Sequence, residues 1–300
     1  DRLSSPNAMS VIAVTGASGS VGSKLVEALI RRGDRVIKLV RGEPDPGDRH
    51  WDQDAPADDL LDGVDAVVHL AGEPIFGRFT SEHKRKIMSS RVGPTRRLAE
   101  LTAGRTFVSA SAIGYYGHDR PERVDEAASP GDDFLAAVCV NWEQAAQVAK
   151  GRSVQVRTGL VMSGVSGLLA VQVPLFKVGL GGPLGDGQQL MSWIAMDDLV
   201  GVYLRALEDD AVSGPINAVA PQPVTNESWA KAVGRQLGRP VWLRMPSFAP
   251  TALLGAQGNR ELALASQNVF PGVLNEIGYQ YRFPTLEDCL ANELYKANLR

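Results

Sequence analysis

The segment VIAVTGASGSVGSKLVEALIRRG, residues 11–33, constrains the fold more than any other part of the chain. It joins an apolar, β-branched run to an amphipathic helix through a loop that carries Gly16, Gly19 and Gly22. Such a loop lets backbone N–H groups approach a phosphate, and the positive end of the helix dipole favours the negative charge. Because glycine triplets also occur in ordinary turns, the interpretation depends on the flanking elements. Together they predict a dinucleotide-phosphate loop in a parallel α/β sheet.

Strand-like and helix-like segments alternate along the first half of the chain. The sequence predicts strands over 11–15, 35–40, 65–72, 105–117 and 153–163, and helices over 21–32, 81–103 and 133–150. The second of these helices could break near Pro94, since proline has no backbone N–H to donate. The alternation predicts an α/β protein with a Rossmann-type, doubly wound parallel sheet.

The sequence changes character after Ser163, where a glycine-rich loop precedes a helix expected to start near Asp197. A short strand over 216–220 and a proline-rich crossover follow. We therefore expect an NAD(P)-binding domain over 9–165, completed by about 193–222, and a smaller α/β substrate-binding lobe over 166–192 and 223–300. Residues 1–8 are expected to be a linker or a remnant of expression. The cleft between the lobes is the expected site.

Composition excludes several function classes. A net charge of −3 over 300 residues offers no basic surplus for nucleic acid, and no apolar run approaches the roughly 20 residues that cross a membrane. Two cysteines and scattered histidines show no metal-ligand spacing and favour a reducing, cytoplasmic compartment. The expected partner is a small-molecule substrate, for a monomer or a homodimer.

The end of the second predicted strand indicates which dinucleotide is bound. An acidic residue there would hold the ribose 2′-hydroxyl of NAD, whereas this chain has Arg41, which suits a 2′-phosphate. Glu43 is the competing candidate, and Arg41 could instead be a solvated loop charge. NADP(H) is therefore favoured over NAD(H). The predicted cofactor-binding residues are Gly16, Ser18, Gly19, Ser20, Val21, Gly22, Arg41, Leu70, Ala71, Gly72, Arg91 and Ser109.

Several sequence blocks resemble one enzyme family. TGASGSVGSKLVEALIRRG, DAVVHLAGE and FVSASAIGYYG resemble the extended, atypical short-chain dehydrogenases/reductases, which include NAD(P)-dependent epimerases and dehydratases. LAGEPI, SRVGPTRRL, NWE and VRTGLVMS are most similar to a poorly characterised branch of epimerase-family proteins, sometimes mislabelled as a cell-division inhibitor. The resemblance covers Met9 to about Leu290. It implies a Rossmann lobe, a small substrate lobe and an oxidoreductase or nucleotide-sugar epimerase activity.

The chain departs from the catalytic pattern of the wider family. That family uses a YxxxK pair, in which the lysine lowers the tyrosine pKa. Aligning Glu143 with the family's acidic residue places Leu135 at the tyrosine position and Cys139 at the lysine position. Ser111 and Tyr116 are the remaining catalytic candidates, although they could equally bond the backbone and shape the pocket.

The loops at the expected cleft supply candidate substrate contacts, namely Glu73, Gln189 and Trp193. Arg91 could anchor a phosphate or extend a basic helix face. Cys139 and His69 are each expected to be core residues rather than reactive groups. Two functions remain open at this point: an NADP(H)-dependent oxidoreductase or epimerase, and a non-catalytic protein that senses NADP(H).

Overall fold

The computed structural model describes residues 9–298, so the predicted linker over 1–8 lies outside the described residues. Its centre is a seven-stranded parallel sheet with the order β11-β7-β5-β4-β1-β2-β3. The strands are β1 (Val11–Thr15), β2 (Arg35–Val40), β3 (Arg49–His50), β4 (Ala66–His69), β5 (Thr106–Ala112), β7 (Ser153–Thr158) and β11 (Gly214–Ala218). The order reverses direction at β1, which is typical of a Rossmann sheet and confirms the predicted fold class.

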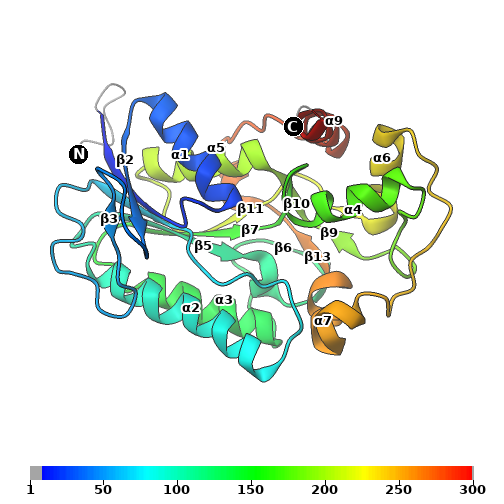
Figure 1. Ribbon diagram of the computed structural model, residues 1–300, viewed down its shortest axis with the longest axis horizontal. Coiled ribbons are helices and arrows are strands. Elements are labelled where there is room, and N and C mark those ends of the chain that lie inside the picture. Colours follow the sequence, from blue (N-terminus) through cyan, green and yellow to red (C-terminus); the bar gives the residue numbers. More distant parts are fainter. Residues whose placement is uncertain (1–8, 299–300) are drawn as a thin grey trace.

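Helices cover both faces of this sheet, which gives three layers (Figure 1). One face carries α1 (Ser20–Arg32) and α5 (Met196–Glu208), and the other carries α2 (Ser81–Glu100) and α3 (Phe134–Ala146). Alternate residues of β1 divide between the two cores: Ile12 and Val14 join the core under α1 and α5, and Ala13 joins the core under α2 and α3. A strand buried on both faces is apolar throughout, as the sequence indicated.

Most of the remaining elements lie beyond one end of the sheet, on the right in Figure 1. The remaining elements comprise β6 (Asp119–Val124), β8 (Leu160–Met162), α4 (Gly167–Lys177), β9 (Leu190–Met191), β10 (Trp193–Ala195), β12 (Val224–Thr225), α6 (Asn226–Leu237), α7 (Thr251–Gly258), β13 (Ser266–Val269), α8 (Gly272–Glu276) and α9 (Leu286–Asn298). A separate core holds α4, α6 and α9 together around Phe176, Trp229 and Leu290. This core supports the proposed smaller lobe, whose boundaries we keep as a proposal.

Two local expectations differ from the structure. Helix α2 runs through Pro94 without a break, because Pro94, Thr95 and Leu98 are buried against the protein. The strand expected over 153–163 is two strands: β7 stays in the central sheet, whereas β8 pairs with β10. The chain turns at Gly159, where a Cβ would lie 2.7 Å from the carbonyl oxygen of Ser192.

The pairing of β6 with β13 was not predicted from the sequence. It is a parallel pair outside the central sheet, and it brings residues near 119 beside residues near 266. Between residues 9 and 298, none of the helices is both long and apolar enough to cross a membrane.

Candidate functional site

The loop after β1 has the geometry that a dinucleotide phosphate requires. Gly16 has a φ of +66°, and a Cβ there would lie 2.9 Å from the backbone nitrogen of Ala71. A Cβ on Gly22 would collide with the carbonyl oxygen of Gly16. The loop therefore packs backbone against backbone, and it leads directly into α1, which begins at Ser20. Since only glycine allows this approach, the residues present fit a pyrophosphate at the start of α1.

A buried hydrogen-bond chain fixes this loop to its neighbours. The Thr15 hydroxyl accepts hydrogen bonds from the backbone N–H groups of Leu70 and Ala71, which follow β4. It also lies 2.7 Å from Nδ1 of His69, and Nε2 of His69 lies 2.9 Å from the Thr95 hydroxyl on α2. Burial lowers the pKa of His69 to about 3, so the ring is neutral. His69 is therefore a core residue, as expected, and it supports the phosphate loop.

The other predicted cofactor residues differ in their exposure and in their hydrogen bonding. Arg41 is exposed just after β2 and makes no hydrogen bond or ion pair with residues 9–298, so its side chain is free to meet a phosphate. Glu43 is exposed on the same loop. Ser18 and Ser20 are exposed at the loop, but Ser109 is fully buried in β5 and donates to the carbonyl oxygen of Ala110. A cofactor contact from the Ser109 side chain therefore has no support in the geometry.

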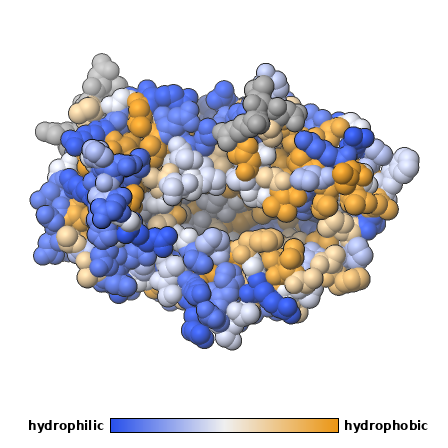
Figure 2. All heavy atoms as spheres, in the orientation of Figure 1, coloured by the Kyte–Doolittle hydropathy of each residue, from blue (hydrophilic) through white to orange (hydrophobic). Residues whose placement is uncertain are grey.

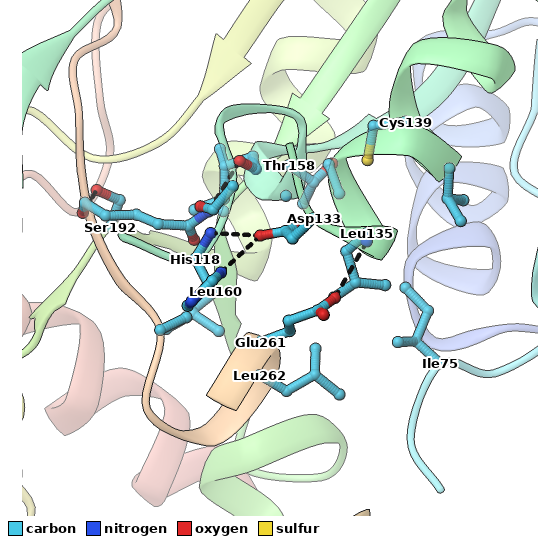
Figure 3. A pocket seen from close by; sticks show the side chains of 18 of the residues that line it. Ile75, His118, Asp133, Leu135, Cys139, Thr158, Leu160, Ser192, Glu261 and Leu262 are labelled. Atoms are coloured by element: carbon cyan, nitrogen blue, oxygen red, sulfur yellow. Dashed lines mark hydrogen bonds and ion pairs between the residues drawn. The ribbon is translucent and has the colours of Figure 1, made fainter. Parts of the chain in front are cut away.

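A cavity of about 200 Å³ lies beyond the carboxyl ends of β5 and β7, against α3 (Figure 3). Its lining comes from both halves of the chain. The residues whose side chains face it include Ile75, Arg91, His118, Asp133, Leu135, Val138, Cys139, Trp142, Leu160, Leu190, Met191, Ser192, Glu261 and Leu262. Parallel α/β sheets bind ligands at this edge. The cavity is therefore the candidate substrate site.

This cavity has apolar side chains where the wider family has its acid–base pair. Leu135 and Cys139 lie one helical turn apart on α3, and both line the cavity. Burial, with a contribution from Glu143, raises the pKa of Cys139 to about 12. Leu135 has no proton to transfer, and the Cys139 thiol stays protonated at neutral pH. The sequence alignment placed these two residues opposite the YxxxK pair of the wider family, and the structure places both in the wall of the cavity.

The geometry argues against the two predicted catalytic residues. Ser111 is buried, and its hydroxyl donates to Oε1 of Glu143 at 2.7 Å. Tyr116 is fully buried, and its hydroxyl donates to Asn217 at 2.7 Å and accepts from Arg157 at 2.9 Å. Burial raises the pKa of Tyr116 to about 12, which is the wrong direction for a proton carrier near neutral pH. Both hydroxyls belong to a structural network outside the cavity lining.

The predicted substrate contacts also lie elsewhere. Trp193 is buried in the second core, and its indole N–H donates to the carbonyl oxygen of Gln222. The Gln189 amide donates to the carbonyl oxygen of Leu184, and the Glu73 side chain is exposed. None of the three lines the cavity. The glycine-rich loop contributes its next residues instead: Leu190, Met191 and Ser192.

Arg91 lines the cavity rather than the phosphate loop. Arg91 is 6% exposed, and its guanidinium donates to the carbonyl oxygens of Ile87 and Glu73. It also lies over the ring of Trp142, at 5.0 Å. The Nε atom has no hydrogen-bond partner, and no carboxylate among residues 9–298 pairs with this charge. Arg91 is thus a buried cation beside the cavity with hydrogen-bonding capacity to spare.

Sequence reasoning missed the polar side chains at the cavity mouth. His118 follows the GYYG turn, Asp133 precedes α3, and Glu261 comes from the distant segment 259–263. Oε2 of Glu261 accepts from the backbone N–H of Leu135 at 3.2 Å, and Oε1 accepts from the Gln257 amide. The sequence placed Asp133 only at the start of an expected helix, whereas the structure makes it the N-cap of α3. The pairing that brings Glu261 here depends on tertiary structure.

Figure 2 shows that this face of the molecule is hollowed near its middle. Hydrophilic side chains dominate over β2 and β3, and hydrophobic side chains gather over the C-terminal elements. The exposed apolar residues of α4 include Val171 and Leu175. One end of this face is therefore mainly hydrophilic and the other mainly hydrophobic.

Comparison with known proteins identifies the family. The model of the NAD dependent epimerase/dehydratase family matches residues 12–137, and a domain of unknown function, DUF1731, matches residues 245–293. An epimerase family protein of Mycobacterium leprae is 38% identical over 291 residues, which are 94% of each chain. The chain belongs to the epimerase family. This extended short-chain dehydrogenase-like assignment agrees with the resemblance found in the sequence.

Two solved structures of epimerase family relatives share the fold over nearly the whole chain. Human epimerase family protein SDR39U1, crystallised with NADPH, is 33% identical, with a TM-score of 0.87 over 95% of this chain and 99% of its own. The nucleoside-diphosphate sugar epimerase from Corynebacterium glutamicum is 43% identical, with a TM-score of 0.82 over 95% of this chain. This chain spans 58% of the length of the Corynebacterium protein.

Proposed function

We propose that this epimerase family protein binds NADP(H) across the carboxyl ends of β1 and β4. The observation that carries the proposal is the phosphate loop: a side chain at Gly16 would meet the backbone of the segment after β4, and one at Gly22 would meet the backbone of Gly16. Arg41 supplies an unpaired charge where the 2′-phosphate would lie. The relative SDR39U1 holds NADPH and matches this chain along its length. The bound nicotinamide would supply hydride chemistry at the neighbouring cavity.

We further propose an oxidoreductase or epimerase reaction on a small polar substrate with an apolar part. The cavity volume of about 200 Å³ lies below the roughly 300–1,000 Å³ of pockets for drug-sized ligands. A nucleotide sugar would therefore keep its nucleotide outside the cavity. The buried Arg91 favours a substrate with an acceptor or negatively charged group, since its Nε lacks a partner. Leu135, Leu160 and Leu262 favour an apolar remainder.

One observation favours the alternative of a non-catalytic NADP(H) sensor. Leu135 and Cys139 occupy the wall where the wider family places its acid–base pair, and neither transfers a proton at neutral pH. A sensor would bind NADP(H) and turn nothing over. The two proposals therefore share the cofactor and differ in turnover.

The test of the cofactor is a calorimetric titration with NADPH and with NADH. Loss of one charge-assisted phosphate contact costs about 1.5–3 kcal/mol, so Arg41→Ala is expected to weaken NADPH binding roughly 10- to 100-fold. NADH binding should change by less than about twofold, because NADH has no 2′-phosphate. Glu43→Ala, on the same loop, is the matched control and should not weaken NADPH binding. If the unmodified protein binds neither dinucleotide, the proposal is wrong.

A further inference from the structure

Two glycines bring the loop after β5 onto the first turn of α3. Gly117 has a φ of +84°, and a Cβ there would lie 3.1 Å from the Cα of Gly131 and 3.3 Å from Oδ2 of Asp133. A Cβ on Gly131 would lie 2.5 Å from the Cα of Gly117. The two backbones are therefore in direct contact. This contact places His118 beside Asp133 at the mouth of the cavity.

Asp133 is held rigidly by three N–H donors. Its Oδ1 accepts from the backbone N–H of Ala136 at 2.8 Å, which caps α3. Its Oδ2 accepts from the backbone N–H of His118 at 2.7 Å, and Nδ1 of the His118 ring lies 2.8 Å away (Figure 3). The Asp133 side chain is only 7% exposed. A carboxylate in this setting accepts from the ring, which fixes the proton on Nδ1.

The second ring nitrogen of His118 is then the free one. Nε2 makes no hydrogen bond with any residue in the described range 9–298, and the ring lines the cavity with 28% of its side chain exposed. The backbone of His118 is fixed from the other side, since its carbonyl oxygen accepts from Ser266 of β13 at 2.7 Å. The ring is thus positioned by both halves of the chain and remains in contact with solvent.

We propose that His118 is the proton carrier of this cavity, with Asp133 as its positioning residue. In the reducing direction, Nε2–H of the imidazolium donates its proton to the carbonyl oxygen of the substrate as that oxygen becomes a hydroxyl. The hydride on the carbon comes from the reduced nicotinamide of the proposed function, on which this inference rests. The ring is left neutral and recovers its proton from water. His118 thereby performs the proton transfer for which the wider family uses its tyrosine, although it stands at a different position in the chain.

Other ionisable groups around the cavity serve different purposes. Both carboxylate oxygens of Glu261 already accept hydrogen bonds, one from the backbone N–H of Leu135 and one from the Gln257 amide, and Arg91 is a permanent cation. Cys139 holds its proton, because burial raises its pKa to about 12. His118 is the group at this wall with a free nitrogen and access to water.

The first arm of the test needs neither cofactor nor turnover. Diethyl pyrocarbonate acylates free imidazole nitrogens, and peptide mass spectrometry reads each histidine separately. We expect His118 to react at least as fast as the exposed His50, and the buried His69 to remain unmodified. In Asp133→Asn the His118 rate should fall several-fold, whereas Asp119→Asn, a matched change on an exposed neighbour, should leave it unchanged. A protected His118, or an equal rate in Asp133→Asn, overturns the pairing.

The second arm measures NADPH oxidation with benzaldehyde, an aliphatic aldehyde and phenanthrenequinone as probes. His118→Gln should lower kcat about 100-fold or more while NADPH affinity stays within about twofold. Asp119→Asn should keep the unmodified kcat. Retention of kcat in His118→Gln, or no turnover of any probe by an unmodified protein that binds NADPH, overturns the assignment. Absence of NADPH binding counts instead against the proposed function, and the labelling arm still decides the His118–Asp133 pair.

Discussion

His69 should make folding stability depend on pH, and the dependence can be calculated. The ring is fully buried between Thr15 and Thr95, and burial lowers its pKa from 6.5 to about 3. As pH falls, the unfolded chain takes up this proton before the folded chain does. The stabilisation is therefore complete above pH 6.5 and is lost progressively as pH falls towards 3. Between pH 8 and pH 5 the loss from this one group is about 2 kcal/mol.

The hydrogen bonds explain why the folded ring resists protonation. The Thr15 hydroxyl already accepts from two backbone N–H groups, so its own hydrogen points to Nδ1 of His69. Nε2–H then donates to the Thr95 hydroxyl. A second proton on Nδ1 would oppose the Thr15 hydroxyl hydrogen and place an unpaired charge in the core.

Urea unfolding from pH 8 to pH 5 tests this reasoning in the unmodified protein and in His69→Gln. Because His69→Gln lacks the titrating ring, its free energy of unfolding should fall by about 2 kcal/mol less than that of the unmodified protein over this pH range. This difference does not depend on the absolute stability of the variant. His50→Gln, which removes an exposed ring, is the control and should keep the original pH dependence. Equal pH dependence in His69→Gln and in the unmodified protein would refute the argument.

Two further predictions concern buried groups. Arg157→Met leaves the Glu143 carboxylate buried without its bidentate partner, so the free energy of unfolding in urea should fall by about 3–5 kcal/mol. A fall of less than about 1 kcal/mol would contradict a buried ion pair. Cys139 and Cys289 should resist a thiol reagent at pH 8 and react fully in denaturant, because burial raises the pKa of each thiol. Rapid labelling of Cys139 in the folded protein would contradict its assignment as an unreactive residue of the cavity wall.

The sequence was informative wherever local chemistry determines the backbone. The spacing of Gly16 and Gly22 marked the phosphate loop, where a side chain at Gly22 would meet the backbone of Gly16. Gly33 marked the end of α1, where the left-handed conformation closes the helix. Apolar runs located the buried strands of the parallel sheet. These signals depend on residues within a few positions of one another.

The candidate site was harder to predict, because it depends on contacts between distant segments. Tryptophan is a residue type that stacks on ligands, which made Trp193 a candidate substrate contact. However, β10 pairs with β8, and the Trp193 ring is buried in the second core. Glu261 carries no motif, and it reaches the cavity only because the segment after α7 packs on the start of α3. Sequence patterns therefore predict a dinucleotide-binding loop far more readily than they predict the residues that line a substrate cavity.

The motif blocks of the family branch have an explanation that does not involve catalysis. Ser111 and Tyr116 come from FVSASAIGYYG, Glu143 from NWE, Arg157 from VRTGLVMS and Asn217 from β11, and the five residues meet in one buried network under the cavity. Removal of any one member of such a buried network leaves its partners unpaired in the interior, so these residues depend on one another. The network joins the ends of β5, β7 and β11 to α3, and thereby fixes the floor of the cavity. Because these buried groups are bonded to one another, the proton transfer that we propose in the cavity is assigned to His118, which lies outside the network.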